Sequence, residues 1–215
     1  MVRSKRRKTK SKQQVISDFI EHFYKLKELA RTGWKQKLEI DNAESVASHT
    51  LLMIVLVSFF SEKYRYSFKQ KDRLVEMTLI HDLAESIIGD ITPEDDKENR
   101  KRKLEDKAFH RITEKISSKT LKKKYLQLWH EYKTNKSFES KFVHLIDKLE
   151  MVVQAKYYLD NRIGVNKEKV KPFFQSSLTY ISHKPNFQLP KTSKKNVKHG
   201  KELEDIKEIL EYFCN

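Results

Sequence analysis

The stretch that decides the fold reads His81-Asp82-Leu83-Ala84-Glu85-Ser86-Ile87-Ile88-Gly89-Asp90. It continues an apolar stripe at helical spacing, which predicts a helix over about residues 72–88. The stripe consists of Leu74, Met77, Ile80, Ala84 and Ile87. Glu85 follows His81 by four residues and Asp82 by three, so the three side chains are expected on a common side of this helix. Gly89 is expected to end the helix.

The same helical spacing extends over almost the whole chain, so the predicted fold class is all-α. Only four glycines and four prolines interrupt the pattern, and no clear run of alternating strand residues is present. Further helices are expected near residues 15–29, 44–64, 96–117, 121–132, 170–182 and 201–213, with a long helix that begins at Ser137. The segment Arg31-Thr32-Gly33-Trp34 is expected to break the first of them. We expect one domain over residues 14–215, with its motifs at about 31–160.

The charge of the chain is strongly basic and unevenly distributed. The net charge is +15, and seven of the 45 lysines and arginines lie among the first twelve residues. A block of like charges with almost no apolar side chains predicts a disordered tail over residues 1–13. An arm that attracts RNA or phosphate is the alternative. Nucleic-acid binding is not favoured for the rest of the chain, because aromatic residues are not interleaved with the basic ones.

No feature of the sequence predicts a membrane or secreted protein. The longest apolar run, Leu51 to Phe60, is shorter than the roughly 18 residues of a membrane span and fits a buried helix. The N-terminus lacks the apolar stretch of a signal peptide. The single cysteine, Cys214, excludes a disulfide within the chain. These observations favour a cytoplasmic location.

A dispersed set of histidines and aspartates has the composition of a metal site. His49 and His81 both lie on apolar helix stripes and are expected to face the core. Asp82 and Asp147 border such stripes, where a charged carboxylate is costly to bury without a partner. Two imidazoles and two carboxylates can hold a divalent metal and leave positions free for water and substrate. Core histidines and ordinary helix-edge aspartates are the alternative, which a lone His-Asp pair would favour.

Three motifs together are more specific than any one of them. They are Glu44-Ser45-Val46-Ala47-Ser48-His49, the stretch from His81 through Gly89-Asp90-Ile91-Thr92-Pro93, and Phe142-Val143-His144-Leu145-Ile146-Asp147-Lys148-Leu149-Glu150. This combination resembles the HD-domain metal-dependent phosphohydrolases, and more narrowly their 5′-deoxynucleotidase branch, over about residues 31–158. The resemblance implies an HD-domain helical bundle with a single buried metal site, whose ligands are His49, His81, Asp82 and Asp147.

The resemblance also implies residues that contact the substrate. Glu85 matches the catalytic acidic residue, which orients the attacking water or transfers a proton. Asp90 matches a substrate-binding aspartate, Trp34 a tryptophan beside the sugar, and Arg31 a phosphate-binding arginine, a role that Lys37 could share. Each has a purely structural alternative. Glu85 could be a helix ion-pair partner, Asp90 a turn residue, Trp34 a core anchor and Arg31 a surface residue.

The function that the resemblance implies is hydrolysis of nucleoside 5′-monophosphates, with deoxyribonucleotides preferred, to nucleoside and phosphate. The mixed nitrogen and oxygen ligands favour Mn²⁺ or Co²⁺, with Fe²⁺, Ni²⁺ and Zn²⁺ as alternatives. The resemblance further implies a homodimer. Two rival functions stay open: an HD phosphohydrolase acting on another phosphoester, such as a cyclic nucleotide or an alarmone, and a nucleic-acid-binding protein on an HD scaffold that uses the basic tail.

Overall fold

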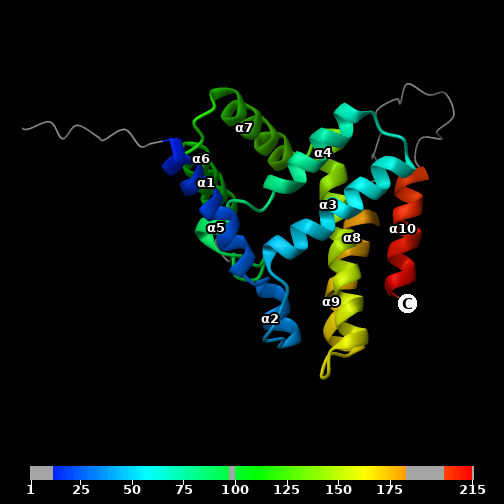
Figure 1. Cartoon of the computed structure of the whole chain (residues 1–215). Helices are drawn as coiled ribbons and strands as arrows, with labels where there is room; N and C mark the ends of the chain where they lie inside the picture. The colour runs from blue at the N-terminus through cyan, green and yellow to red at the C-terminus, as the bar shows by residue number, and fades with distance from the viewer. Residues whose placement is uncertain (1–11, 97–99, 183–200, 215) are drawn as a thin grey trace, which may run out of the picture.

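Helices account for all the regular structure in the part of the chain that the computed structural model describes, which is residues 12–96, 100–182 and 201–214. The helices are α1 (Lys12–Glu28), α2 (Thr32–Leu38), α3 (Val46–Lys63), α4 (Phe68–Ile80), α5 (Glu85–Ile88), α6 (Lys101–Thr113), α7 (Lys119–Thr134), α8 (Phe138–Asn161), α9 (Lys167–Ser182) and α10 (Lys201–Cys214) (Figure 1). The all-α fold class predicted from the sequence is therefore confirmed.

The long helix α8 is the centre of the packing. It contacts α3, α4, α7, α9 and α10, and Figure 1 shows α9 running alongside it. Its apolar face is fully buried, with Phe142 and Ile146 inaccessible to solvent. Because α3 and α4 also pack on α8, the helices that carry the three sequence motifs meet around one core.

Local capping signals explain where several helices begin and end. The hydroxyl of Ser137 accepts a hydrogen bond from Ser140 N–H (3.1 Å) at the start of α8, as the sequence predicts. Ser45 caps α3 in the same way through Ser48 N–H (3.1 Å). Gly89 ends α5 with a φ of 81°, a backbone conformation that favours glycine.

The expectation of one continuous helix over residues 72–88 is wrong. α4 ends at Ile80, and residues 81–84 form a turn before the short α5. Leu83 N–H donates to Ile80 O (3.1 Å), so the hydrogen bond reaches three residues back rather than four. The site residues of this stretch therefore leave a tight turn instead of a straight helix.

The segment after α1 also differs from expectation. α1 ends at Glu28 as predicted, but Thr32–Leu38 forms the helix α2. Trp34 accounts for this, because its ring is buried against Phe173 of α9, with 4.2 Å between ring centroids. A single β-bridge between Ala30 and Ser45 holds the start of this segment beside α3.

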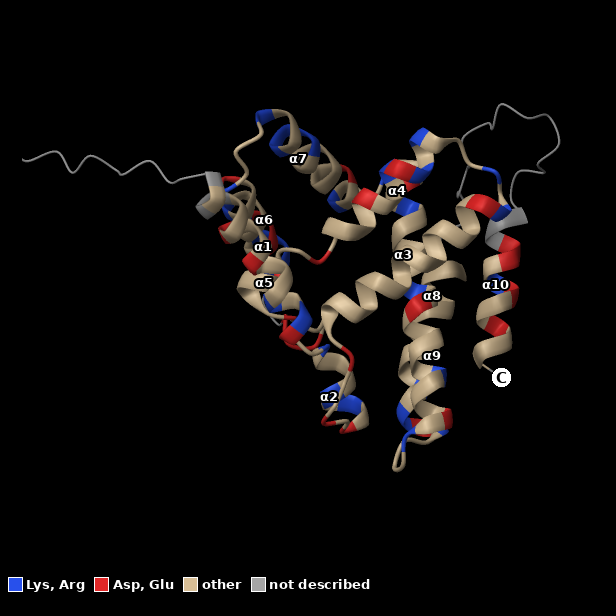
Figure 2. Ribbon diagram, in the orientation of Figure 1, with Lys and Arg blue, Asp and Glu red and all other residues tan. Residues whose placement is uncertain are grey.

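Two further sequence expectations concern the basic N-terminal tail and the apolar helix α3. α1 begins at Lys12, so residues 12–13 belong to a helix, and the rest of the expected basic tail lies outside the described residues. Among the helices of the described residues, one, α3, is long and apolar enough to cross a membrane by length and composition alone. It is uncharged over most of its length (Figure 2), packs against α1, α4 and α8, and is 39% buried.

Candidate metal centre

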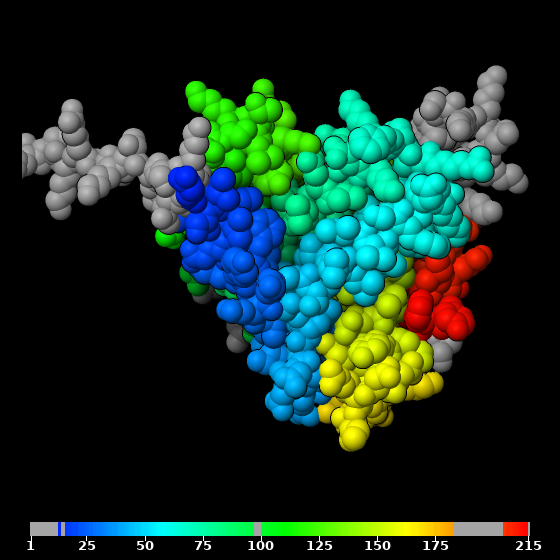
Figure 3. Space-filling view, in the orientation of Figure 1, coloured from blue at the N-terminus to red at the C-terminus, as the bar shows by residue number. Residues whose placement is uncertain are grey.

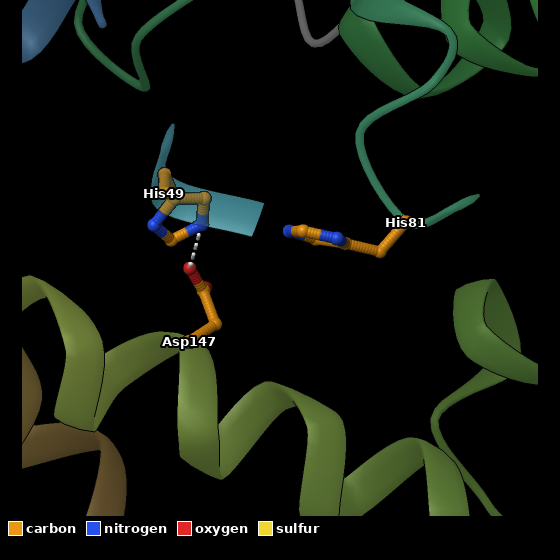
Figure 4. Close-up of side chains that lie close together, drawn as sticks. All are labelled: His49, His81 and Asp147. Atoms are coloured by element: carbon orange, nitrogen blue, oxygen red, sulfur yellow. Dashed lines mark ion pairs between the residues drawn. The ribbon is translucent and has the colours of Figure 1, made fainter. Parts of the chain in front are cut away.

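Two histidines and an aspartate from three separate elements meet at one point. His49 comes from the first turns of α3, His81 follows the end of α4, and Asp147 lies on α8. A ligand atom from each of the three lies within 4.8 Å of the others. Figure 4 shows the His81 ring directed toward His49 and Asp147, whose Nε2 and Oδ1 atoms are 3.3 Å apart.

Both imidazoles are oriented through Nδ1, so that Nε2 of each ring is directed at this point. His81 Nδ1–H donates to the backbone oxygen of Thr78 (2.7 Å), and His49 Nδ1–H donates to Glu150 Oε2 (2.5 Å). The Nε2 atom of each ring is buried and makes no hydrogen bond within the described residues. Two Nε2 atoms facing one carboxylate, with each ring oriented through Nδ1–H, are an arrangement in which a divalent metal can bind.

Asp82 completes the set expected from the sequence. Its Oδ2 lies 3.0 Å from His81 Nε2 and 3.9 Å from His49 Nε2. Arg31 Nη1–H donates to the same oxygen at 3.2 Å. The structure therefore brings together all four residues that the resemblance assigns to the metal.

The electrostatics of this cluster favour a bound cation. Burial and Arg31 disfavour a charged His49, yet Glu150 and Asp147 outweigh them and raise the pKa of His49 to about 10. Burial also opposes ionisation of Asp147, but Lys148 and His49 outweigh it and hold the pKa of Asp147 well below its usual range. The carboxylates thus stay charged and attract a cation. The donor set fits a divalent metal, which can take the place of the His49 proton.

A cleft of about 540 Å³ opens onto the cluster, and Glu85 lies in its wall. Glu85 is 4% exposed, and its Oε1 is 3.5 Å from Lys101 Nζ. Burial and the charges of Asp82 and Asp90 raise the pKa of Glu85 well above its usual value, although Lys101 opposes the shift. A carboxyl group with a raised pKa beside a metal site is suited to donate or accept a proton.

The three residues assigned to substrate all line this cleft, but two of them also hold the fold together. Asp90 accepts hydrogen bonds from Thr32 N–H at its carboxylate (2.6 Å) and from the Thr32 hydroxyl at its backbone oxygen (2.7 Å), which fixes the start of α2. Trp34 is only 2% exposed. Arg31 reaches the metal cluster through Asp82. Lys37 borders the cleft and pairs with Glu94 at 2.6 Å.

A second acidic layer lies behind His49. Glu150 is fully buried and accepts the His49 Nδ1 proton, while Glu44 accepts a hydrogen bond from Trp34 Nε1–H (2.8 Å). Burial and the charge of Glu150 raise the pKa of Glu44 to about 7. Glu44, His49 and Glu150 could also hold a cation, but the hydrogen bond to Nδ1 assigns this layer the role of orienting His49.

Sequence reasoning assigned no role to four residues that the structure places at the site. Glu44 and Glu150 stand at the ends of the quoted motifs, five and three residues from a ligand respectively, so the motifs contained a signal for them. Lys148 Nζ lies 3.9 Å from Asp147 Oδ2 and follows it in sequence. Lys101 carried no signal, because it comes from the highly charged start of α6.

A larger groove of about 740 Å³ runs along α7 to the start of α8. Lysines such as Lys119 and Lys122 line it, together with His130. None of the predicted site residues borders it, so the smaller cleft is the candidate active site.

A family model described as the HD domain matches residues 23–188. The 5′-deoxynucleotidase HDDC2 of Homo sapiens is 34% identical over 177 residues, covering 81% of this chain and 82% of that protein. The 5′-deoxynucleotidase hdd1 of Schizosaccharomyces pombe is 33% identical over 147 residues, covering 66% of this chain and 72% of that protein.

Solved structures share the fold over nearly the full length. A conserved hypothetical protein from Pyrococcus furiosus superposes with a TM-score of 0.64 at 25% identity, covering 91% of this chain and 99% of that one. A protein from Magnetospirillum magnetotacticum, described as a predicted metal-dependent phosphohydrolase, has a TM-score of 0.62 at 19% identity, with 94% and 93% covered. The second likeness concerns the fold alone.

Proposed function

Because the chain belongs to the HD domain family, we propose that it is a metal-dependent phosphohydrolase that converts deoxynucleoside 5′-monophosphates to nucleoside and phosphate. One observation carries the proposal: two buried imidazole Nε2 atoms without a hydrogen bond face Asp147 at the floor of a cleft. The names of the similar proteins, which are 5′-deoxynucleotidases in organisms from yeasts to mammals, support the substrate class.

His49, His81, Asp82 and Asp147 would hold the metal. When bound, the metal supplies a Lewis acid for the phosphate group and lowers the pKa of a water molecule. Mn²⁺ or Co²⁺ is favoured by a set of two imidazoles and two carboxylates, with Fe²⁺, Ni²⁺ and Zn²⁺ as alternatives.

Basic residues around the cluster suit a phosphate dianion. Arg31 lies within hydrogen-bond distance of Asp82, and Lys148 lies beside Asp147, so both cations border the metal ligands. Lys101 adds a third positive charge on the Glu85 side of the cleft. A guanidinium binds two phosphate oxygens at once, which would fix the phosphorus atom in line with an attacking water.

Glu85 would transfer the proton that hydrolysis requires. The leaving 5′-oxygen of the nucleoside must gain a proton, and the attacking water must lose one. The raised pKa of Glu85 favours its protonated form, which can donate a proton to the leaving oxygen. Lys101 Nζ donates to the backbone oxygen of Ile91 (2.7 Å), so its position next to Glu85 is fixed by the chain.

The sugar would lie between the metal cluster and α2. Asp90 would accept a hydrogen bond from a sugar hydroxyl with the carboxylate that also holds Thr32. Trp34 would close the wall beside C2′, where an additional hydroxyl would be excluded.

A phosphate-release screen tests the proposed activity. Matched ribo- and deoxyribonucleoside 5′-monophosphates are offered with Mn²⁺ and Co²⁺, next to a cyclic nucleotide and an alarmone. The proposal expects release from the 5′-monophosphates, with the deoxy forms faster, and none in the presence of a chelator. The cyclic nucleotide and the alarmone are followed by chromatography, because ring opening releases no free phosphate and alarmone cleavage releases pyrophosphate. Products from these two compounds only would show that the site acts on another phosphoester.

We also propose that the protein is a homodimer formed through α1 and α3. These helices lie side by side on one face (Figure 3). They expose an apolar stripe, which points to an interface, unlike scattered single apolar side chains. The stripe consists of Ile16, Ile20, Tyr24, Leu51, Val55 and Phe59. Light scattering should give a dimer for the wild type and a monomer for Val55→Glu. A monomeric wild type would overturn the assignment.

The cytoplasmic location expected from the sequence is part of the same proposal. Fluorescence microscopy of the tagged full chain should show diffuse cytoplasmic signal. Signal confined to a membrane would contradict it and would favour α3 as a membrane-spanning helix.

A further inference from the structure

A chain of hydrogen-bonded polar groups, centred on the buried His22, lies beside the turn that carries the site. His22 of α1 is 2% exposed. Its Nδ1 lies 2.8 Å from the hydroxyl of Ser86, and its Nε2 lies 3.0 Å from Lys115 Nζ, just after α6. The Ser86 hydroxyl in turn lies 2.8 Å from the backbone oxygen of Leu83.

The partners of this chain fix where each proton lies. A lysine ammonium can only donate, so His22 Nε2 accepts from Lys115. The one hydroxyl proton of Ser86 goes to the carbonyl of Leu83, so His22 Nδ1–H must donate to the Ser86 oxygen. Every group is satisfied only when His22 is neutral with its proton on Nδ1.

The charges around His22 keep it in this state. Burial and Lys115 lower the pKa of His22 to about 4, with smaller contributions in the same direction from Lys25 and Arg111 and an opposing one from Glu21. The hydrogen-bond pattern is therefore constant over the range in which ordinary histidines titrate.

These hydrogen bonds hold the turn at Leu83 and at Ser86, on both sides of Glu85. Ser86 directly follows Glu85, and Leu83 directly follows Asp82. None of the residues that line the cleft belongs to the chain of Lys115, His22 and Ser86. These groups therefore reach the substrate only through the turn that they hold.

We propose that His22 is a positioning residue, which holds Glu85 at its place in the cleft through the hydrogen bond from Nδ1–H to Ser86. The inference rests on the proposed hydrolase function for its kinetic consequence. Displacement of a catalytic group by even about 1 Å can cost on the order of a hundredfold in rate, so an anchor one residue from Glu85 controls turnover without contacting substrate.

Two variants at His22 and a control at Leu26 separate this role from plain core packing. His22→Asn places an amide N–H near the position of Nδ1 and can still donate to Ser86. His22→Gln places its amide near Nε2 and can still accept from Lys115, but it loses the Ser86 bond. Leu26→Ala, one turn further along α1, is a buried truncation that tests loss of stability alone.

The first readout is steady-state kinetics on a deoxyribonucleoside 5′-monophosphate with Mn²⁺. We expect His22→Gln to lower kcat by about 10- to 100-fold, with KM and metal content unchanged. His22→Asn and Leu26→Ala should stay within about threefold of the wild type, since both keep the bond to Ser86. Equal kcat values for Gln and Asn, or losses that follow the melting temperature across all variants, would overturn the proposal.

The second readout needs no turnover. Amide hydrogen exchange reports opening of the turn through the N–H groups of Glu85 and Ser86, which donate to Asp82 O (3.0 Å) and Leu83 O (3.3 Å). Exchange should accelerate by about tenfold or more in His22→Gln and remain near wild-type values in His22→Asn. Unchanged exchange in His22→Gln would overturn the inference, whereas a wild type that releases no phosphate would overturn only the proposed function.

Discussion

The two sides of the His49 imidazole use the same residue types for different purposes. On the Nε2 side, Asp82 and Asp147 border the cleft, and both have a pKa below the usual range. On the Nδ1 side, Glu150 is fully buried, and burial with the charge of Glu150 raises the pKa of Glu44 to about 7. Access to the cleft, rather than residue type, therefore separates the carboxylates that can hold a metal from those that orient its ligand.

Removing a ligand on the Nε2 side should have the largest effect. His81→Ala or Asp147→Ala deletes one of four proposed metal ligands, so metal binding and turnover should both be lost. Elemental analysis and phosphate release measure the two losses. Ser61→Ala, a buried polar change on α3 outside the cleft, serves as the control and should keep both. Full metal occupancy in both ligand variants would show that His81 and Asp147 are not metal ligands.

Glu85→Gln should separate proton transfer from metal binding. The amide keeps the shape of the side chain but cannot transfer the proton, so the rate should fall by about 10²–10⁴. The metal should remain, because Glu85 is not among the proposed ligands. Rates and metal content are measured on the same preparation. Turnover near the wild-type value would give Glu85 a structural role.

Loss of the hydrogen bond from His49 Nδ1–H to Glu150 should lower metal affinity without abolishing metal binding. Glu150→Leu removes the acceptor of the His49 proton, and metal affinity should fall by about 10- to 100-fold. Glu150→Gln keeps an oxygen acceptor of the same length and should lose less. Competition with a chromogenic chelator measures both affinities. If Glu150→Leu bound metal as tightly as the wild type, the supporting role would be wrong.

The smallest effect is expected at Trp34, which belongs to the buried side through its bond to Glu44. Trp34→Ala should raise ribonucleotide turnover relative to deoxyribonucleotide turnover by on the order of tenfold or less, because only part of the ring reaches the cleft. Asp90→Ala should reduce both rates. Paired kcat/KM values for one base decide the question. Trp34→Phe, which keeps the packing, should leave the ratio unchanged. An unchanged ratio in Trp34→Ala would show that Trp34 does not discriminate against the 2′-hydroxyl.

The helices and the Nε2 side of the site could be predicted from the sequence. Apolar spacing located α1, α3, α7, α8, α9 and α10 to within a few residues, and the histidine and aspartate motifs identified the residues that meet in space. The pattern succeeded there because a core-facing ligand must lie on an apolar stripe.

The turn at residues 81–84 could not be predicted in the same way. It contains neither glycine nor proline, and its first residue, His81, has helical backbone angles of −60° and −36°. A tightened turn and a helix therefore share one apolar pattern, and only tertiary packing separates them. α2 was missed for a similar reason, since burial of Trp34 against α9 overrides the glycine beside it.

The buried supports were beyond the reach of sequence patterns. His22 and Ser86 are 64 residues apart, and no motif in the sequence contains both residues. Glu150 stood within a quoted motif, but its spacing from Asp147 also fits an ordinary helix partner. Pairings of this kind follow from how helices pack, which composition and spacing do not determine.

Metal removal and return on the wild-type chain tests the central claim most directly. The protein is stripped with a chelator, titrated with Mn²⁺ or Co²⁺, and assayed for phosphate release from a deoxyribonucleoside 5′-monophosphate. The account predicts no release from the stripped protein and full recovery at about one metal ion per chain. Phosphate release that persists after complete metal removal would contradict it.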